Sequence, residues 1–119
     1  MKQNWPDWDV YERDCCTCVY CGFSGINNFN AWRQLAIDHL IPTCRGGTNN
    51  HDNKVVACHR CNTLKGSYDP SDGWGSLPVP KDLKDQLILK VKTFLNIDGS
   101  EERKDFDLMM GELRAEGRC

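Results

Sequence analysis

This sequence lacks the features of a membrane-spanning or exported protein. No apolar run approaches the roughly 20 residues that cross a bilayer as a helix, and the opening stretch, MKQNWPDWDVYERD, has no apolar segment after Lys2. We therefore expect no membrane partner, no secretory signal and a cytoplasmic location. Repeats and low-complexity tracts are also absent. The length of 119 residues suits one domain, and 39% hydrophobic and 27% charged residues suit a soluble globular protein.

The sequence also lacks an overall excess of positive charge. The formal net charge is −2, which argues against binding to nucleic acid through general charge alone. The charge is unevenly spread, however, because both ends of the chain are acidic while residues 33–68 are mainly basic. A local basic patch attracts a phosphate backbone, although short segments also vary by a few charges without any such role. The basic residues of this segment are Arg33, Arg45, Lys54, Arg60 and Lys65.

Cysteine, in contrast, is abundant. Eight cysteines in a chain with no export signal favour metal ligands over disulfides. Two CxxC pairs, Cys18 with Cys21 and Cys58 with Cys61, are separated by 36 residues. A two-residue spacer lets both thiolates of a pair reach one ion, and two pairs complete a tetrahedral sulfur shell, which favours Zn²⁺. Four thiolates leave no open coordination position, so we expect this zinc to be structural.

The first cysteine pair has an alternative. Cys15 and Cys18 also form a CxxC motif, so Cys15 competes with Cys21 for the place of the zinc ligand. We favour Cys21 because Gly22 follows it and can adopt the left-handed conformation that a zinc knuckle requires. A disulfide-stabilised or thiol-redox protein is a further reading of these cysteines, and bound zinc would exclude it.

Hydrophobic patterning predicts a small α+β fold. Residues 35–41 and 53–57 are expected to be short strands, separated by a loop rich in Gly, Asn and Thr. A helix is expected from His59 to about Ser67. The remainder of the core should be a short N-terminal helix and the zinc site.

The predicted organisation has two parts. Residues 1–68 should form the core that contains the zinc site. Residues 69–119 should supply a linker over 69–80, a helix over 81–96 and a last helix from Ser100, with both helices packed on the core as a single compact unit.

Polar side chains with catalytic potential lie between and beside the zinc pairs. Asp38 and His39 are adjacent on the first predicted strand, so they point to opposite faces unless the strand twists or the site lies at its edge. On a helix, Asn62 diverges from Cys61 by about 100°, so one side chain can face the zinc and the other a second site. Oxygen donors such as Asp38 and Asn62 suit Mg²⁺ or Mn²⁺, and a neutral histidine can accept a proton from water. Taken singly, His39 is better explained as a partly buried histidine and Asp38 as a turn or cap residue, and Asn62 could equally be a cap residue.

The order of these motifs resembles that of a known family. The string AIDHLIPTCRGGTNNHDNKVVACHRCNTLKG, preceded by CVYCG, closely resembles the HNH endonucleases that have a ββα-metal core and a four-cysteine zinc. The resemblance covers roughly residues 13–67 and is specific, because DH, P, GG, N, CxxCN and KG all occur in order. It implies a treble-clef-like ββα-metal core with a zinc knuckle, flanked by N- and C-terminal helices.

The resemblance also implies a role for each catalytic candidate. His39 would be the general base that activates water, and Asp38 and Asn62 would hold the catalytic divalent ion. Asn53 would brace the loop and orient the histidine. Some relatives place a further histidine where this chain has Gly66, so we expect two protein ligands to the ion.

The implied activity is metal-dependent hydrolysis of phosphodiester bonds in DNA, with Mg²⁺, Mn²⁺ or another divalent ion as cofactor beside the structural Zn²⁺. A monomer would nick one strand, a homodimer would cut both, and a protein partner is one source of specificity. Phosphate contacts are expected from Lys65, which fits the KG motif best, and from Arg45, Lys54 and Arg60. The alternative function is a non-catalytic zinc module that binds nucleic acid or protein.

Overall fold

The computed structural model describes residues 5–72, 81–96 and 99–117 of the chain. In these ranges, no helix has both the length and the apolar character needed to cross a membrane. Part of the predicted linker, residues 73–80, lies outside the described residues.

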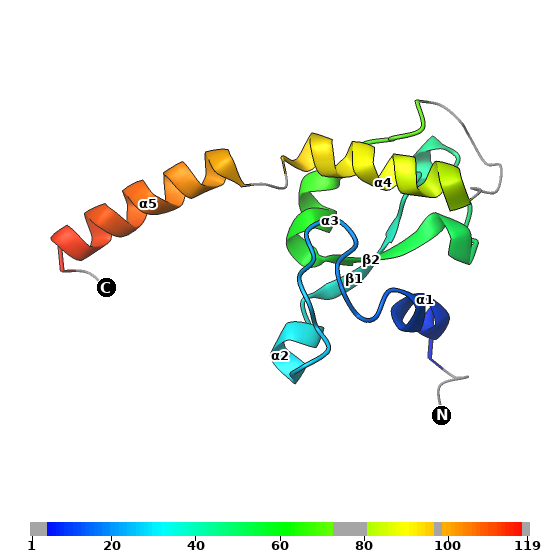
Figure 1. The fold of residues 1–119 in the computed structure, drawn as a ribbon, viewed down its shortest axis with the longest axis horizontal. Coiled ribbons are helices and arrows are strands. Elements are labelled where there is room, and N and C mark those ends of the chain that lie inside the picture. The colour runs from blue at the N-terminus through cyan, green and yellow to red at the C-terminus, as the bar shows by residue number, and fades with distance from the viewer. Residues whose placement is uncertain (1–4, 73–80, 97–98, 118–119) are drawn as a thin grey trace.

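Two short strands form the centre of the molecule (Figure 1). β1 (Leu35–His39) and β2 (Lys54–Cys58) pair antiparallel, with Leu35 opposite Cys58 and His39 opposite Lys54. The predicted strands match these bounds within two residues. Both strands are rich in aliphatic residues, and β2 is buried along its whole length, so the sheet can serve as a fixed base for the residues at its ends.

The loop between the strands contains two short 3₁₀ turns, η2 (Thr43–Arg45) and η3 (His51–Asn53). Here the backbone folds tightly on itself. A β-carbon placed on Gly47 would lie only 1.7 Å from the carbonyl oxygen of Ile41, so no other residue fits this position without moving the loop.

α3 (His59–Lys65) follows β2 without an intervening loop. The Cys58 sulfur caps its first turn by accepting a hydrogen bond from the backbone N–H of Cys61. α1 (Trp8–Arg13) is tied to the start of β2 by Arg13, whose guanidinium donates to the carbonyls of His51 and Lys54 at 2.9 and 2.6 Å. The order β1, β2, α3 confirms the predicted α+β class, with helices around a two-stranded sheet.

α4 (Lys81–Leu95) covers the core, whereas α2 (Phe29–Trp32) is a single turn before β1. Leu87, Val91 and Leu95 repeat at four-residue steps along α4, and all three are buried members of the hydrophobic core. This is the packing expected of an amphipathic helix, and its bounds agree with the predicted helix over 81–96.

α5 (Ser100–Ala115) differs from the expectation that both C-terminal helices pack on the core. It has no buried residue, and Phe106, Leu108 and Met109 are 51%, 64% and 57% exposed. In Figure 1 this helix extends away from the remainder of the molecule. The physical reason is visible in its sequence, because acidic residues alternate with the apolar ones and leave α5 with a weak apolar stripe.

Candidate functional site

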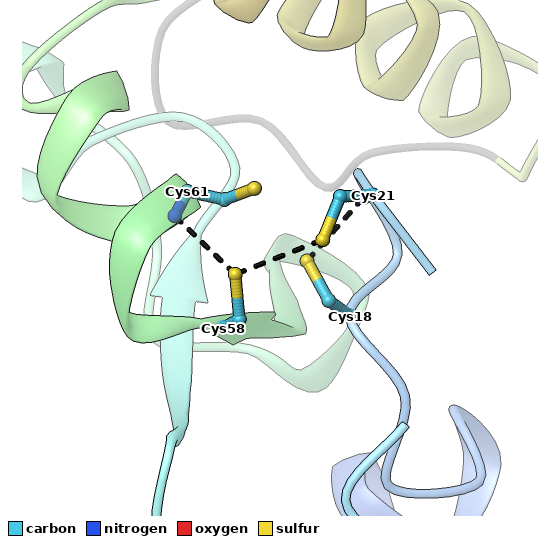
Figure 2. Close-up of side chains that lie close together, drawn as sticks. All are labelled: Cys18, Cys21, Cys58 and Cys61. Carbon is cyan, nitrogen blue, oxygen red and sulfur yellow. Dashed lines mark hydrogen bonds between the residues drawn. The ribbon is translucent and has the colours of Figure 1, made fainter. Parts of the chain in front are cut away.

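Four cysteine sulfurs converge where the knuckle before β1 meets the start of α3 (Figure 2). The Sγ atoms of Cys18, Cys21, Cys58 and Cys61 all lie within 4.8 Å of one another. Cys18 and Cys21 belong to a tight turn that Gly22 completes with φ +82°. Each pair also has a backbone N–H directed at a sulfur, from Cys21 to Cys18 at 3.5 Å and from Cys61 to Cys58 at 3.4 Å.

This geometry decides between the two candidates for the first cysteine pair. Cys21 belongs to the sulfur cluster, and its Sγ lies 3.7 Å from that of Cys58. Cys15, the alternative, is exposed and is not a member of the cluster. The pair that shares one site is therefore Cys18 and Cys21.

The cluster fits a zinc ion. A tetrahedral site with Zn–S bonds of about 2.3 Å requires sulfurs about 3.8 Å apart, and the Cys21–Cys58 separation is 3.7 Å. Burial and, after it, the neighbouring sulfurs raise the pKa of Cys61 above its ordinary value, and the same causes together raise the pKa of Cys21 to about 11. Four thiolates in this space would repel one another, and a divalent cation removes that cost.

Asp38, near the end of β1, is buried and held by two donors. Its side-chain oxygen Oδ2 accepts a hydrogen bond from the Tyr20 hydroxyl at 2.5 Å and lies 3.2 Å from Lys65 Nζ. Oδ1 has a longer contact of 3.4 Å with the same ammonium. Burial raises the pKa of Asp38, while the Lys65 charge and the Tyr20 hydrogen bond oppose that rise.

Lys65, predicted as a phosphate contact, has a buried side chain in this structure. Its side chain is 0% exposed, and Nζ also donates to the carbonyl of His39 at 3.0 Å. The ammonium therefore joins the last turn of α3 to the end of β1, and in this structure it is not presented to a ligand from solvent.

His39, the last residue of β1, is half-buried. Its Nε2 lies 2.9 Å from Oδ1 of Asn49, in the loop between the strands. Because an amide oxygen accepts, this contact is a hydrogen bond in the tautomer whose Nε2 carries the hydrogen, and in that neutral ring Nδ1 keeps a lone pair. Asn49 is not among the residues predicted from the sequence, because an asparagine in a GGTNN stretch is typical of a turn.

Asn53 is buried, and its side chain is occupied by the loop backbone. Oδ1 accepts from the N–H of Ile41 at 2.9 Å, and Nδ2 donates to the carbonyls of Ile41 and Thr48 at 3.0 and 2.9 Å. The backbone carbonyl of Asn53 also accepts from the N–H of Leu40 at 2.8 Å. These bonds fix the chain immediately after His39, so Asn53 holds the loop in place.

Asn62 lies on α3 directly after Cys61 and is half-buried. Across the described ranges, no hydrogen bond of its side-chain amide is recorded. The amide oxygen is therefore available as a ligand. α3 also carries Cys61 of the sulfur cluster and Lys65, which pairs with Asp38. One helix therefore contains Asn62 and contacts Asp38, the two candidate ligands of the divalent ion.

The other three predicted phosphate contacts differ in their surroundings. Lys54 is buried and pairs with Asp7 at 2.7 Å, and the Arg60 guanidinium pairs with Glu102 on the surface. Arg45 is exposed at the end of η2 and lines a surface hollow of about 650 Å³ beside Tyr68. Of the four predicted residues, Arg45 is the one that is both exposed and without a recorded ion pair among the described residues.

Residues 18–68 match the HNH endonuclease family. This segment is therefore similar to an HNH endonuclease domain. The match begins at the first zinc-cluster cysteine and ends after α3, so it contains the sulfur cluster, both strands and all the catalytic candidates.

Two relatives, each a much longer chain, match part of this one. The CRISPR-associated endonuclease Cas9 of Corynebacterium diphtheriae is 42% identical over 57 residues, which are 47% of this chain and 5% of that protein. The CRISPR-associated endonuclease Cas9 of Actinomyces naeslundii is 34% identical over 67 residues, which are 56% of this chain and 6% of that protein. The chain therefore spans a small part of these relatives. No solved structure matches it.

Proposed function

We propose that the HNH-like segment is a metal-dependent DNA endonuclease in which His39 is the general base. The observation that carries this proposal is the hydrogen bond from His39 to Asn49 at 2.9 Å. It leaves one ring nitrogen unprotonated at the end of β1, next in sequence to Asp38. The match to the HNH endonuclease family supports the reaction class, because residues 18–68 contain His39, Asp38 and Asn49, and the two relatives are endonucleases by name.

The donor set suits a divalent ion such as Mg²⁺ or Mn²⁺. Asp38 offers a carboxylate oxygen and Asn62 an amide oxygen, which are the hard donors these ions prefer. When bound, the ion would neutralise charge on the scissile phosphate and on the leaving 3′-oxygen. With only two protein ligands, the remaining positions would be completed by water and by the substrate phosphate.

His39 would remove the proton from an attacking water through Nδ1. The oxygen of that water bonds to phosphorus as the bond to the 3′-oxygen breaks, which leaves 5′-phosphate and 3′-hydroxyl ends. Positioned base catalysis of this kind contributes about 10²–10⁴-fold. Asn49 and Asn53 hold the ring and the loop that follows it, so the reacting nitrogen is placed before substrate arrives.

Arg45 is the phosphate contact that the surface supports best, since it is exposed and lines a surface hollow. We infer that Zn²⁺ in the four-cysteine cluster is structural. The cytoplasmic location, the choice between a nicking monomer and a homodimer, and a partner that supplies specificity stay predictions.

The test is an incubation of purified protein with supercoiled plasmid, in EDTA and then in Mg²⁺ or Mn²⁺. Nicked or linear DNA should form only with the divalent ion, and His39→Ala should abolish it. His51→Ala is the matched control, because this histidine is exposed and lies in the same loop. DNA binding with no cleavage under any metal would support the non-catalytic zinc module instead.

A further inference from the structure

Tyr20 connects the two sites of the HNH-like segment. It lies between Cys18 and Cys21 in the knuckle, yet its hydroxyl reaches the Asp38 carboxylate at 2.5 Å. The ring is 1% exposed and belongs to the buried core cluster. One side chain of the zinc turn therefore supplies the shortest hydrogen bond to a proposed ligand of the catalytic ion.

The knuckle that carries Tyr20 is fixed at both sides. The backbone N–H of Val19 donates to the carbonyl of Val56 on β2 at 2.9 Å, and Cys18 and Cys21 lie in the sulfur cluster. Because the neighbours of Tyr20 are held, its hydroxyl has little freedom to follow Asp38 if the carboxylate turns. The position of Tyr20 thus sets the position of the carboxylate.

The two donors to Asp38 act differently. Lys65 supplies a positive charge, which competes with a divalent cation for the same carboxylate. The Tyr20 hydroxyl is a neutral donor, so it orients the carboxylate and adds no opposing charge. Both short contacts fall on Oδ2, so Oδ1, whose contact with Lys65 is 3.4 Å, is the oxygen left for an ion.

We propose that Tyr20 is a positioning residue that couples the zinc knuckle to the catalytic metal site, by holding Oδ2 of Asp38 so that Oδ1 faces the divalent ion. This inference rests on the proposed function, because it takes Asp38 to be a metal ligand. Without the hydroxyl, Lys65 is the remaining donor, and the carboxylate can rotate to give both oxygens to the ammonium. The affinity for the divalent ion then falls, although both ligands and the zinc site are intact.

The test measures Mn²⁺ binding to the zinc-loaded protein, by the loss of the electron paramagnetic resonance signal of free Mn²⁺. Tyr20→Phe keeps the ring in the core and removes only the hydroxyl. It should weaken Mn²⁺ binding by about tenfold, at the lower end of the 10–100-fold loss typical when a partner of a metal ligand is removed. Tyr11→Phe, the same change at a half-buried tyrosine on α1, should leave the affinity unchanged. Zinc content should be equal in all three proteins.

A double-variant cycle separates this inference from the proposed function. Asp38→Asn should weaken Mn²⁺ binding by itself, and adding Tyr20→Phe to it should cause no further loss. If Asp38→Asn weakens binding and Tyr20→Phe does not, the coupling is wrong while the ligand assignment stands. If Asp38→Asn has no effect, the ligand assignment and the coupling both fail.

A second measurement needs no substitution, so it applies even if Tyr20→Phe does not fold. The chain has three tyrosines, and 3-fluorotyrosine labelling gives each a ¹⁹F resonance. Addition of Mg²⁺ should shift the resonance of Tyr20 and leave those of Tyr11 and Tyr68 in place. An unmoved Tyr20 resonance at saturating Mg²⁺ would overturn the coupling.

Discussion

Lys65 and Asp38 form a buried ion pair, with Nζ 3.2 Å from Oδ2 and side chains that are 0% and 7% exposed. The pair joins the end of α3 to the end of β1, where the proposed base and metal ligand also lie. An unpaired charge in this position destabilises the fold, because removal of one partner of a buried pair typically lowers the free energy of unfolding by about 3–5 kcal/mol. The lysine of the KG motif therefore stabilises the site through its buried contacts with Asp38 and the His39 carbonyl.

The first prediction concerns this pair. Lys65→Met keeps much of the volume of the side chain but leaves Asp38 without its cation, so the free energy of unfolding should fall by about 3 kcal/mol. Arg45→Ala, at an exposed site, should change it by less than about 0.5 kcal/mol while weakening DNA binding. Urea denaturation of the zinc-loaded proteins measures the first effect, and a salt-dependent DNA titration the second. Equal stability of Lys65→Met and wild type would contradict the buried pair.

The second prediction concerns the loop. Asn53→Ala removes three hydrogen bonds from the backbone of residues 41–48 and leaves buried groups unpaired. We expect a loss of about 2–3 kcal/mol in unfolding free energy and a lower cleavage rate, because the chain after His39 is released. Asn50→Ala, at an exposed residue of the same loop, is the control and should retain both properties.

The third prediction concerns the orientation of His39. Asn49→Ala removes the acceptor for Nε2, so both neutral tautomers of the ring become accessible. The cleavage rate should fall by about 10–100-fold, part of the ~10²–10⁴-fold that a positioned base contributes, with little change in KM. The ¹⁵N chemical shifts of the imidazole report the tautomer directly. A wild-type tautomer and rate in Asn49→Ala would show that this hydrogen bond has no catalytic consequence.

The fourth prediction concerns zinc. The purified protein should contain about one equivalent of zinc, and Cys61→Ser should lose it together with the folded state, because metal binding energy is folding energy. Cys44→Ser, at an exposed cysteine outside the cluster, should retain zinc. Metal analysis with thermal unfolding measures both, and a stable, zinc-free Cys61→Ser protein would contradict a structural zinc.

The fifth prediction concerns alkaline pH. Burial and then the Asp38 charge raise the pKa of Tyr20 above its ordinary value of 10.0. Above that pH the unfolded chain releases the Tyr20 proton while the folded chain retains it, so stability should fall with rising pH. The slope from one such group is about 1.4 kcal/mol per pH unit. Tyr20→Phe should remove this contribution, whereas that of Tyr11, whose pKa burial also raises, stays in both proteins.

Much of this fold is predictable because its determinants are local. The CxxC pairs fix which sulfurs meet, and the short aliphatic runs on either side of a Gly- and Asn-rich loop predict β1 and β2. The four-residue spacing of Leu87, Val91 and Leu95 likewise predicts that α4 is buried. In each case the spacing of residues close together in the sequence determines which side chains can share one metal site or one face of a helix or strand.

The interior of the site depends on contacts between distant segments, and these have no local signature. Tyr20 and Lys65 reach Asp38 from positions 18 residues earlier and 27 residues later in the chain. A lysine in a basic segment is typical of a phosphate contact, so its burial at Lys65 was not expected. The exposure of α5 has no local signature either, since Phe106 and Met109 form an apolar pattern that does not indicate which surface would cover them.

The central claim is that His39 is the base of a divalent-ion-dependent DNA hydrolysis. Single-turnover cleavage of an end-labelled DNA duplex in Mg²⁺, with wild type, His39→Ala and His51→Ala, tests it most directly. We predict that His39→Ala is slower by about 10²–10⁴-fold with unchanged zinc content, that His51→Ala cleaves as wild type does, and that the ends are 5′-phosphate and 3′-hydroxyl. Cleavage by His39→Ala at the wild-type rate, or equal cleavage in EDTA, would contradict the account.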